Sequence, residues 1–172
     1  DRVLWTLSMA HHFAVSIILY LRFGATIVIE NSPMAEDVLA TAEAGGATVA
    51  YGAHFHYALL AADRGEFCWS SLRLAVSTAA ALPLETARAF HERFGKSLVQ
   101  ALGVIECGLP LLNLDKRGEK PESVGLPVEG WEISLRDESG LEVGTGKTGE
   151  LWLRGGGTFD AYLDPWQPGS EV

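Results

Sequence analysis

The sequence predicts an α/β fold: a layered α/β lobe with a mostly parallel sheet, followed by a β-rich, partial barrel-like lobe. Up to about residue 112, short apolar runs alternate with longer helical patterns, a rhythm typical of βαβ units. After residue 112, apolar and polar residues alternate with a period of two. We therefore expect an α/β lobe over residues 1–112 and the start of a β-rich lobe over residues 113–172.

Four apolar runs in the first lobe are rich enough in apolar residues to be strands that are buried on both faces, as in a parallel sheet. They cover residues 25–30, 47–52, 72–77 and 98–102, and residues 3–7 form a weaker opening strand.

Helical patterns separate these strands. A largely apolar pattern over residues 9–23 can end at Gly24. Ser32 and Pro33 suit the N-cap and the first position of a second helix, which should run to residues 45–46. Further helices are expected over residues 55–63 and 84–94. Four such crossovers favour layered α/β architecture.

The second lobe begins with a polar, turn-rich stretch over residues 115–123. Residues 131–136 and 150–154 alternate between apolar and polar, which predicts half-exposed antiparallel strands. The connection between them is rich in Gly, Ser and Thr. The last ten residues contain two prolines and no periodicity, so we expect the chain to stop in a loop.

Composition excludes several classes of protein. Thirteen Lys and Arg residues against 22 Asp and Glu residues give a net charge of −9, which is the wrong sign for binding nucleic acid or anionic lipid. The apolar stretch over residues 13–21 is too short to span a bilayer. Cys68 and Cys107 lie far apart, without metal-binding spacing, so we expect a reducing, cytoplasmic environment. Because the chain starts at Asp1, we expect a piece of a longer protein.

The segment Gly144 to Gly149 reads GTGKTG and ends like a phosphate-binding P-loop. The glycine that this motif requires five residues before its second glycine is replaced by Leu141. An expected strand follows the segment, where a P-loop needs a helix. A hairpin turn is therefore the favoured interpretation.

Two histidine pairs could suggest a metal site. His11 and His12 are adjacent, so on a helix their side chains diverge, and His54 and His56 converge only in a strand. Core or surface histidines are the favoured interpretation. Residues 2–29 contain no Asp or Glu, so a pocket built there has no carboxylate of its own to hold an ammonium group.

Glu106 follows an expected strand and is flanked by Gly103 and Gly108. That position is the carboxyl edge of a parallel sheet, where open α/β folds bind ligands. A lone carboxylate there can hold Mg²⁺ that bridges to substrate phosphates, or it can be a solvated loop acid. The small residues over 77–82 end another strand, where they either admit a flat ligand or pack against a helix.

Taken in order, several segments resemble the adenylate-forming (AMP-binding) superfamily, which includes acyl- and aryl-CoA synthetases. The segment SMAHHF at 8–13 resembles the family's Pro-x-x-His segment, and LRLAVSTAAALPLE resembles Leu-Arg…Ser-Gly-Gly-Ala-Pro-Leu. The segment LVQALGVIECG resembles Gln-Gly-Tyr-Gly-x-Thr-Glu. Further matches are SVGLP at 123–127 and GELWLRGGGTFDAYL at 149–163, so the resemblance covers essentially the whole chain.

The resemblance implies a ligase that joins a small aryl or short acyl acid to ATP and passes the acyl group to a thiol of CoA or a carrier protein. Glu106 and His11 would be catalytic, and Glu106 would also bind Mg²⁺. The acyl pocket would be lined by His11, His12, Phe13, Ser16, Cys107 and Gly108. The nucleotide would lie along Thr78, Ala79, Ala80, Ala81, Leu102, Gly103, Val104 and Ile105.

Three departures from the family pattern bear on activity. Leu102 replaces the usual Tyr that stacks on adenine, and Ile105 replaces a Thr that contacts phosphate. Residues 79–81 contain no Gly. The resemblance also implies that a phosphate-binding loop precedes Asp1 and a small C-terminal domain follows Val172. We therefore expect these residues alone to be inactive, and a non-catalytic module that binds a ligand or carrier protein is the alternative.

Overall fold

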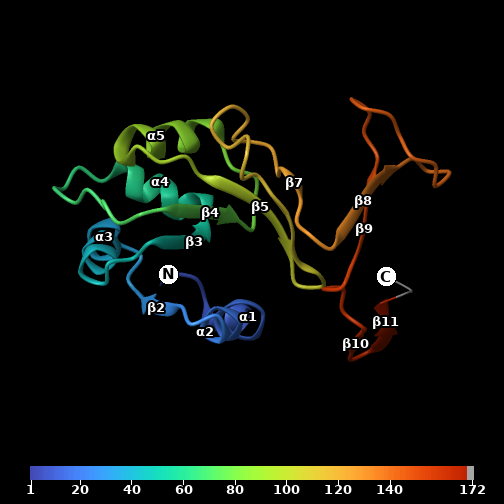
Figure 1. Cartoon of the computed structure of the whole chain (residues 1–172), viewed down its shortest axis with the longest axis horizontal. Helices are drawn as coiled ribbons and strands as arrows, with labels where there is room; N and C mark the ends of the chain where they lie inside the picture. Colours follow the sequence, from blue (N-terminus) through green and yellow to red (C-terminus); the bar gives the residue numbers. More distant parts are fainter. Residues whose placement is uncertain (170–172) are drawn as a thin grey trace.

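The computed structural model describes residues 1–169, apart from the side chains of His11, Ala14 and Val15. Figure 1 shows a sheet with helices on both faces and, beyond it, a β-rich C-terminal part that extends away from the helices. Among the described residues, no helix is long and apolar enough to cross a membrane.

A seven-stranded mixed sheet organises the chain, with the strand order β2-β1-β3-β4-β5-β6-β7. The first five strands pair in parallel, as predicted. They are β1 (Arg2–Trp5), β2 (Thr26–Ile29), β3 (Val49–Ala53), β4 (Leu74–Thr78) and β5 (Val99–Val104).

Two further strands extend the sheet in the antiparallel sense. The β5 strand turns directly into β6 (Gly108–Leu112), which pairs with β7 (Leu126–Pro127). Neither β6 nor β7 was expected from the sequence. The sheet therefore continues beyond residue 112, and the division into domains at that residue stays a prediction.

Helices connect the parallel strands, so the predicted crossovers are confirmed. The first crossover is a continuous helical segment with a π-helical turn in its middle. The helices are α1 (Met9–His12), the π-helix (Phe13–Ile17), α2 (Ile18–Arg22), α3 (Ala35–Ala44), α4 (His54–Ala62) and α5 (Leu84–Phe94).

The predicted start of α3 is wrong by two residues. Its N-cap is Met34, and the helix begins at Ala35. The Ser32 hydroxyl accepts a hydrogen bond from the Met34 backbone N–H at 3.2 Å and donates one to the Asp37 carboxylate at 2.5 Å. Ser32 therefore stabilises the turn that precedes the helix, because Pro33 keeps the chain extended before the first helical turn.

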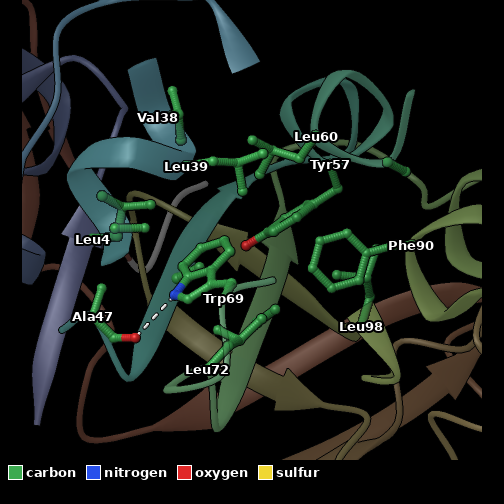
Figure 2. Close-up of a cluster of buried hydrophobic side chains, with 14 of the residues drawn as sticks. Leu4, Val38, Leu39, Ala47, Tyr57, Leu60, Trp69, Leu72, Phe90 and Leu98 are labelled. Carbon is green, nitrogen blue, oxygen red and sulfur yellow. Dashed lines mark hydrogen bonds between the residues drawn. The ribbon is translucent and has the colours of Figure 1, made fainter. Parts of the chain in front are cut away.

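Alternate residues of the buried strands form two cores, one on each face of the sheet. Val3, Trp5 and Tyr51 pack under the first helical segment, together with Ile17. On the opposite face, under α3, α4 and α5, lies a larger cluster (Figure 2). Its labelled members are Leu4, Val38, Leu39, Ala47, Tyr57, Leu60, Trp69, Leu72, Phe90 and Leu98.

Polar groups inside the larger cluster are paired. The indole N–H of Trp69 donates to the Ala47 carbonyl at 3.0 Å (Figure 2). The Tyr57 hydroxyl donates to the Val76 carbonyl at 2.8 Å, and its ring meets Phe90 edge to face at 5.2 Å. Because an unpaired buried donor costs about 1–3 kcal/mol, these bonds let large aromatic side chains enter the core.

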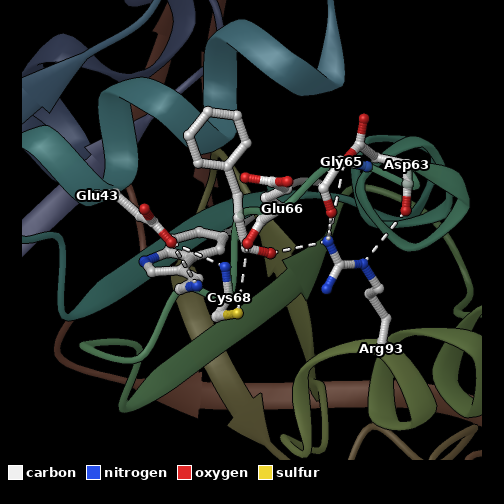
Figure 3. A network of polar contacts seen from close by, with 8 residues as sticks. Glu43, Asp63, Gly65, Glu66, Cys68 and Arg93 are labelled. Atoms are coloured by element: carbon white, nitrogen blue, oxygen red, sulfur yellow. Dashed lines mark hydrogen bonds and ion pairs between the residues drawn. The ribbon is translucent and has the colours of Figure 1, made fainter.

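The loop that carries Trp69 is held by charged side chains (Figure 3). The Glu43 carboxylate accepts the backbone N–H groups of Cys68 and Trp69 at 2.8 and 3.0 Å. From α5, the Arg93 guanidinium donates to the carbonyls of Asp63 and Gly65, at 3.2 and 2.9 Å. These bonds satisfy backbone groups that no strand or helix would pair.

The β-rich part contains two separate antiparallel pairs. The predicted strands at 131–136 and 150–154 are confirmed as β8 (Trp131–Arg136) and β9 (Glu150–Gly155), paired along their full length. The second pair consists of β10 (Ala161–Leu163) and β11 (Trp166–Pro168).

Two expectations about this part need correction. The expected loop at the end of the chain is wrong in part, since β11 lies within the last ten residues and pairs with β10. Pairing here needs only three residues on each strand, which is too short for a periodic pattern. Two-stranded sheets, and no barrel, are found between residues 128 and 169.

The GTGKTG segment is confirmed as a turn followed by a strand. Gly146 has a φ of +82°, and β9 begins at Glu150. A P-loop needs a helix at this point, whose N-terminal amides would hold phosphate. The segment therefore lacks the geometry of a P-loop.

Candidate functional site

The strongest candidate site is a cavity at the carboxyl edge of the parallel sheet, where α/β folds commonly bind ligands. Strands β3, β4 and β5 all end at this edge. The cavity has a volume of about 480 Å³. It is lined by His12, Ser16, Leu19, Tyr51, Thr78, Ala79, Gly103, Val104, Ile105, Gly108 and Leu109.

One wall of the cavity comes from the first helical segment. His12, Ser16 and Leu19 lie about one turn apart on a single face, and all three line the cavity. The π-helical turn between them is a rare conformation that is frequent at functional sites. The Trp5 ring meets the His12 imidazole edge to face at 5.3 Å and stacks on Tyr51 at 5.2 Å. The aromatic core thus fixes this wall.

Beside this wall, residues at the ends of β3 and β4 carry two hydroxyl groups. Tyr51, near the end of β3, is buried and shares a hydrogen bond with Thr78, the last residue of β4. Burial raises the pKa of Tyr51, because the phenolate would be poorly solvated. At neutral pH the cavity therefore offers neutral hydroxyl groups here, suited to hydrogen bonding with a polar ligand.

Ala79 and Gly103 bring the backbone of two strand ends close to the cavity. Ala79 has a φ of +70°, a left-handed conformation that favours glycine. A Cβ atom at Gly103 would lie 2.8 Å from the Leu109 side chain and 3.1 Å from the Thr78 hydroxyl. Gly103 therefore allows β5 to pack against Thr78.

Glu106 lies in the turn between β5 and β6. Its Oε1 atom accepts a hydrogen bond from the Tyr162 hydroxyl at 2.6 Å, and its backbone carbonyl accepts the Phe159 N–H at 2.7 Å. The hydrogen bond from Tyr162 is the main cause that lowers the pKa of Glu106 below its usual value. The carboxylate is thus ionised at neutral pH, beside Ile105 at the rim of the cavity.

The cavity brings together residues that the resemblance assigned to two different subsites. His12, Ser16 and Gly108 from the expected acyl pocket line it. So do five residues of the expected nucleotide site: Thr78, Ala79, Gly103, Val104 and Ile105. Residues of the two expected subsites thus line one cavity.

Other expected residues lie outside the lining of the cavity. Phe13 is 53% exposed, because it follows His12 on a different face of the helix. Cys107 is buried in the turn, and burial raises the pKa of its thiol. Leu102 precedes Gly103 in β5, so its side chain points to the opposite face of the sheet from the cavity.

Three more expected site residues have no place in the lining. Ala80 and Ala81 are exposed just beyond Ala79. His11 lies in α1, and its side chain is outside the described part of the structure.

Three lining residues were not expected from the sequence: Leu19, Tyr51 and Leu109. Tyr51 sits within an apolar strand and Leu19 within an apolar helix, so neither breaks its local pattern. Only the alternation of β3 could have shown that Tyr51 points to the same face as the first helical segment. None of the lining residues is acidic, and those contributed by the acid-free stretch over residues 2–29 are His12, Ser16 and Leu19.

Glu106 is the candidate metal ligand. No group of three or more His, Cys, Asp or Glu side chains that could hold a metal occurs among the described residues. His56 is occupied locally, since its Nδ1 accepts the Ala53 N–H at 3.2 Å. A single carboxylate fits Mg²⁺, which commonly binds one or two carboxylates together with substrate phosphates.

The amino-acid sequence matches a known protein family. Residues 1–163 match the model of the family described as AMP-binding enzyme. The chain belongs to the AMP-binding enzyme family. The resemblance seen in the sequence is therefore confirmed. The cavity lies between the first helical segment and the ends of β3, β4 and β5.

Individual relatives include several acid–CoA ligases. The chain is 33% identical over 144 residues to a 4-hydroxybenzoate–CoA/benzoate–CoA ligase of Rhodopseudomonas palustris, covering 81% of this chain and 26% of the ligase. A benzoate CoA ligase structure from Burkholderia xenovorans has a TM-score of 0.83 at 28% identity, covering 95% of this chain and 35% of that one.

A third relative forms a different bond. The amide bond synthetase McbA from Marinactinospora thermotolerans has a TM-score of 0.88 at 27% identity, covering 95% of this chain and 34% of the synthetase. The chain thus spans about a quarter to a third of the length of these relatives.

Proposed function

We propose that this chain forms part of an AMP-forming carboxylate ligase that activates an aryl or short acyl acid with ATP. A carboxylate oxygen attacks the α-phosphorus, the bond to pyrophosphate breaks, and an acyl-adenylate forms. A thiol of CoA or a carrier protein then attacks the acyl carbon and releases AMP. The observation that carries this proposal is the single cavity shared by the two expected subsites.

The helical wall suits the acid. His12 and Ser16 offer polar atoms, and Leu19 and the neighbouring Tyr51 ring supply apolar surface. An α-amino acid would bring an ammonium group, which needs a carboxylate partner when it is buried. The acid-free lining therefore favours a simple aryl or acyl acid, as in the ligases that the chain resembles.

The strand ends suit the nucleotide. Ala79 and Gly103 line the cavity with little or no side chain, which suits a flat ligand, and Thr78 adds a hydroxyl. Glu106 would hold Mg²⁺, which neutralises phosphate charge as the transferred group is attacked. The residues of the cavity would orient the reactants, and further cationic groups would be supplied by other parts of the protein.

Acid-dependent exchange of pyrophosphate into ATP tests this proposal. The full-length protein is expected to catalyse exchange with benzoate-like or short aliphatic acids. The isolated 172 residues are expected to catalyse none. Exchange that occurs only with amino acids would overturn the assigned substrate class, and exchange by the isolated segment would overturn the need for other parts of the protein.

A second candidate is a non-catalytic module that binds a ligand or a carrier protein. It is favoured by Ile105, which lines the cavity with an apolar side chain that is 67% exposed. Replacing it by Thr would restore the hydroxyl of the family pattern, whose bond to a charged group is worth about 1.5–3 kcal/mol. Exchange that rises tenfold or more in Ile105→Thr indicates an impaired enzyme, and no change indicates the non-catalytic module.

A further inference from the structure

Glu106 is held by a segment that lies more than fifty residues away in the sequence. The Tyr162 hydroxyl, on β10, donates a hydrogen bond of 2.6 Å to Oε1 of Glu106. Strand β10 belongs to a different sheet from β5 and β6, the strands that flank the turn around Glu106. The bond therefore joins the β-rich part of the chain to the carboxyl edge of the parallel sheet.

Two further contacts place Tyr162 in this position. The Phe159 backbone N–H donates to the Glu106 carbonyl at 2.7 Å, and the Phe159 ring packs on the Tyr162 ring at 4.6 Å. A Cβ atom at Gly157 would lie 3.1 Å from the Cys107 carbonyl, so the approaching chain touches the same turn. The backbone and the tyrosine ring are thus fixed independently of the hydroxyl group.

We propose that Tyr162 is a positioning residue for the carboxylate of Glu106. The hydroxyl occupies Oε1 and leaves Oε2 as the oxygen for a cation. A glutamate on a turn otherwise samples several rotamers, and ordering it costs side-chain entropy. The Tyr162 bond fixes the rotamer before the cation and nucleotide arrive. The inference rests on the proposed role of Glu106 as a Mg²⁺ ligand.

A purely structural role for the hydroxyl fits the surroundings less well. Tyr162 is 38% exposed, and an exposed hydrogen bond adds little to folding. Hydrogen-bond partners of metal ligands, in contrast, are worth about 10–100-fold in metal affinity. Because this pair is exposed, we expect an effect at or below the lower end of that range.

The test is a titration with Mn²⁺, followed by electron paramagnetic resonance, on the full-length protein with α,β-methylene-ATP bound. Tyr162→Phe is expected to raise the half-saturating Mn²⁺ concentration by about 3–10-fold. The midpoint of thermal unfolding and the binding of the nucleotide without metal should stay unchanged. Unchanged Mn²⁺ binding in this variant would overturn the positioning role.

Tyr57→Phe is the matched control, since it also removes one tyrosine hydroxyl. That hydroxyl is buried and donates to the Val76 carbonyl at 2.8 Å, away from Glu106. Tyr57→Phe should lower the unfolding midpoint and leave Mn²⁺ binding unchanged. If instead both variants weaken Mn²⁺ binding only in step with lost stability, the hydroxyl of Tyr162 is structural and the positioning role fails.

Glu106→Gln separates this inference from the proposed function. It should weaken Mn²⁺ binding more than Tyr162→Phe does, and adding Tyr162→Phe to it should have no further effect. Unchanged Mn²⁺ binding in Glu106→Gln would overturn the assignment of Glu106 itself. A strong effect of Glu106→Gln beside no effect of Tyr162→Phe would overturn only the role of the tyrosine.

Discussion

The α/β region and the β-rich part of the molecule differ in how far their tryptophan side chains are exposed. In the α/β region, Trp5 and Trp69 are each 1% exposed, whereas Trp152 and Trp166 in the β-rich part are 48% and 68% exposed. The first region buries its apolar side chains on both faces of one sheet. The second holds its shape by strand pairing and a few side-chain contacts. Stability should therefore reside in the first region.

The candidate site lies where the two regions meet. The cavity is built from strand ends and the first helical segment, but Glu106 is oriented from β10. Substitutions in the two regions should therefore differ in kind. Those in the α/β region should cost folding free energy, and those near Tyr162 should alter the site with little cost to folding.

The largest expected difference is between two tryptophans. Trp69→Ala should lower the free energy of unfolding by about 3–5 kcal/mol, because it empties a buried site and removes the bond to the Ala47 carbonyl. Trp152→Ala should cost less than about 1 kcal/mol, since it loses an exposed ring 4.5 Å from the Arg136 guanidinium. Urea denaturation of both variants measures the difference, and equal losses would contradict it.

A glycine at the connection between the regions should be nearly as sensitive. Gly125 has a φ of +83°, and a Cβ atom there would lie 2.1 Å from the Leu112 carbonyl oxygen. Gly125→Ala should cost about 3 kcal/mol or more, because backbone strain and a clash with β6 add together. Gly140→Ala is the control, with a φ of +79° and open space around it, and it should cost about 1 kcal/mol.

A gain of stability is expected at the cavity. Ala79 adopts a φ of +70° that glycine adopts without strain, so Ala79→Gly should raise the free energy of unfolding by about 0.5–1 kcal/mol. Its exposed neighbour Ala80 provides the control, since Ala80→Gly should lower stability slightly through the entropy of the unfolded chain. Thermal unfolding of the two variants should shift in opposite directions, and a loss in both would show that Ala79 is unstrained.

The smallest expected effect concerns a carboxylate held by local contacts. Glu30 accepts bonds from the Thr41 hydroxyl and the Ser32 backbone N–H, and the first of these is the main cause that lowers its pKa. Since the folded pKa is below the unfolded value, this contribution to stability is present above about pH 4.3 and is lost as the pH falls.

Thr41→Val should therefore raise the pKa of Glu30 toward its ordinary value and reduce stability at neutral pH but not at strongly acidic pH. Thr41→Ser keeps the hydroxyl and should keep the low pKa. Carboxyl chemical shifts followed through an NMR titration give the measurement. If the pKa of Glu30 stays low in Thr41→Val, the backbone hydrogen bonds alone lower it, and the role of the Thr41 hydroxyl is contradicted.

The regular part of the fold could be predicted because its physics is local. Strand and helix patterns identified the four crossovers, and Gly95 marked the end of α5 with a φ of +65°. Strand β6 was missed because Pro110 interrupts a short run, and β11 because proline closes it. Such strands form through pairing with distant partners, which local propensity does not record.

The candidate site was predictable only in part, for a similar reason. His12, Thr78 and Gly103 carry chemical or conformational signals and were found. Tyr51 carries none within its strand, and only the fold brings it to the cavity. The partnership of Glu106 with Tyr162 depends on how a distant hairpin docks, which no spacing in the sequence encodes.

A crystal structure of the full-length protein with benzoyl-sulfamoyl adenosine, a stable mimic of an acyl-adenylate, tests the shared cavity most directly. The benzoyl group is expected against His12, Ser16 and Leu19, with the adenosine along the strand ends at Ala79 and Gly103. A mimic bound elsewhere on the protein, or with its benzoyl group outside the helical wall, would contradict a cavity that joins the two subsites.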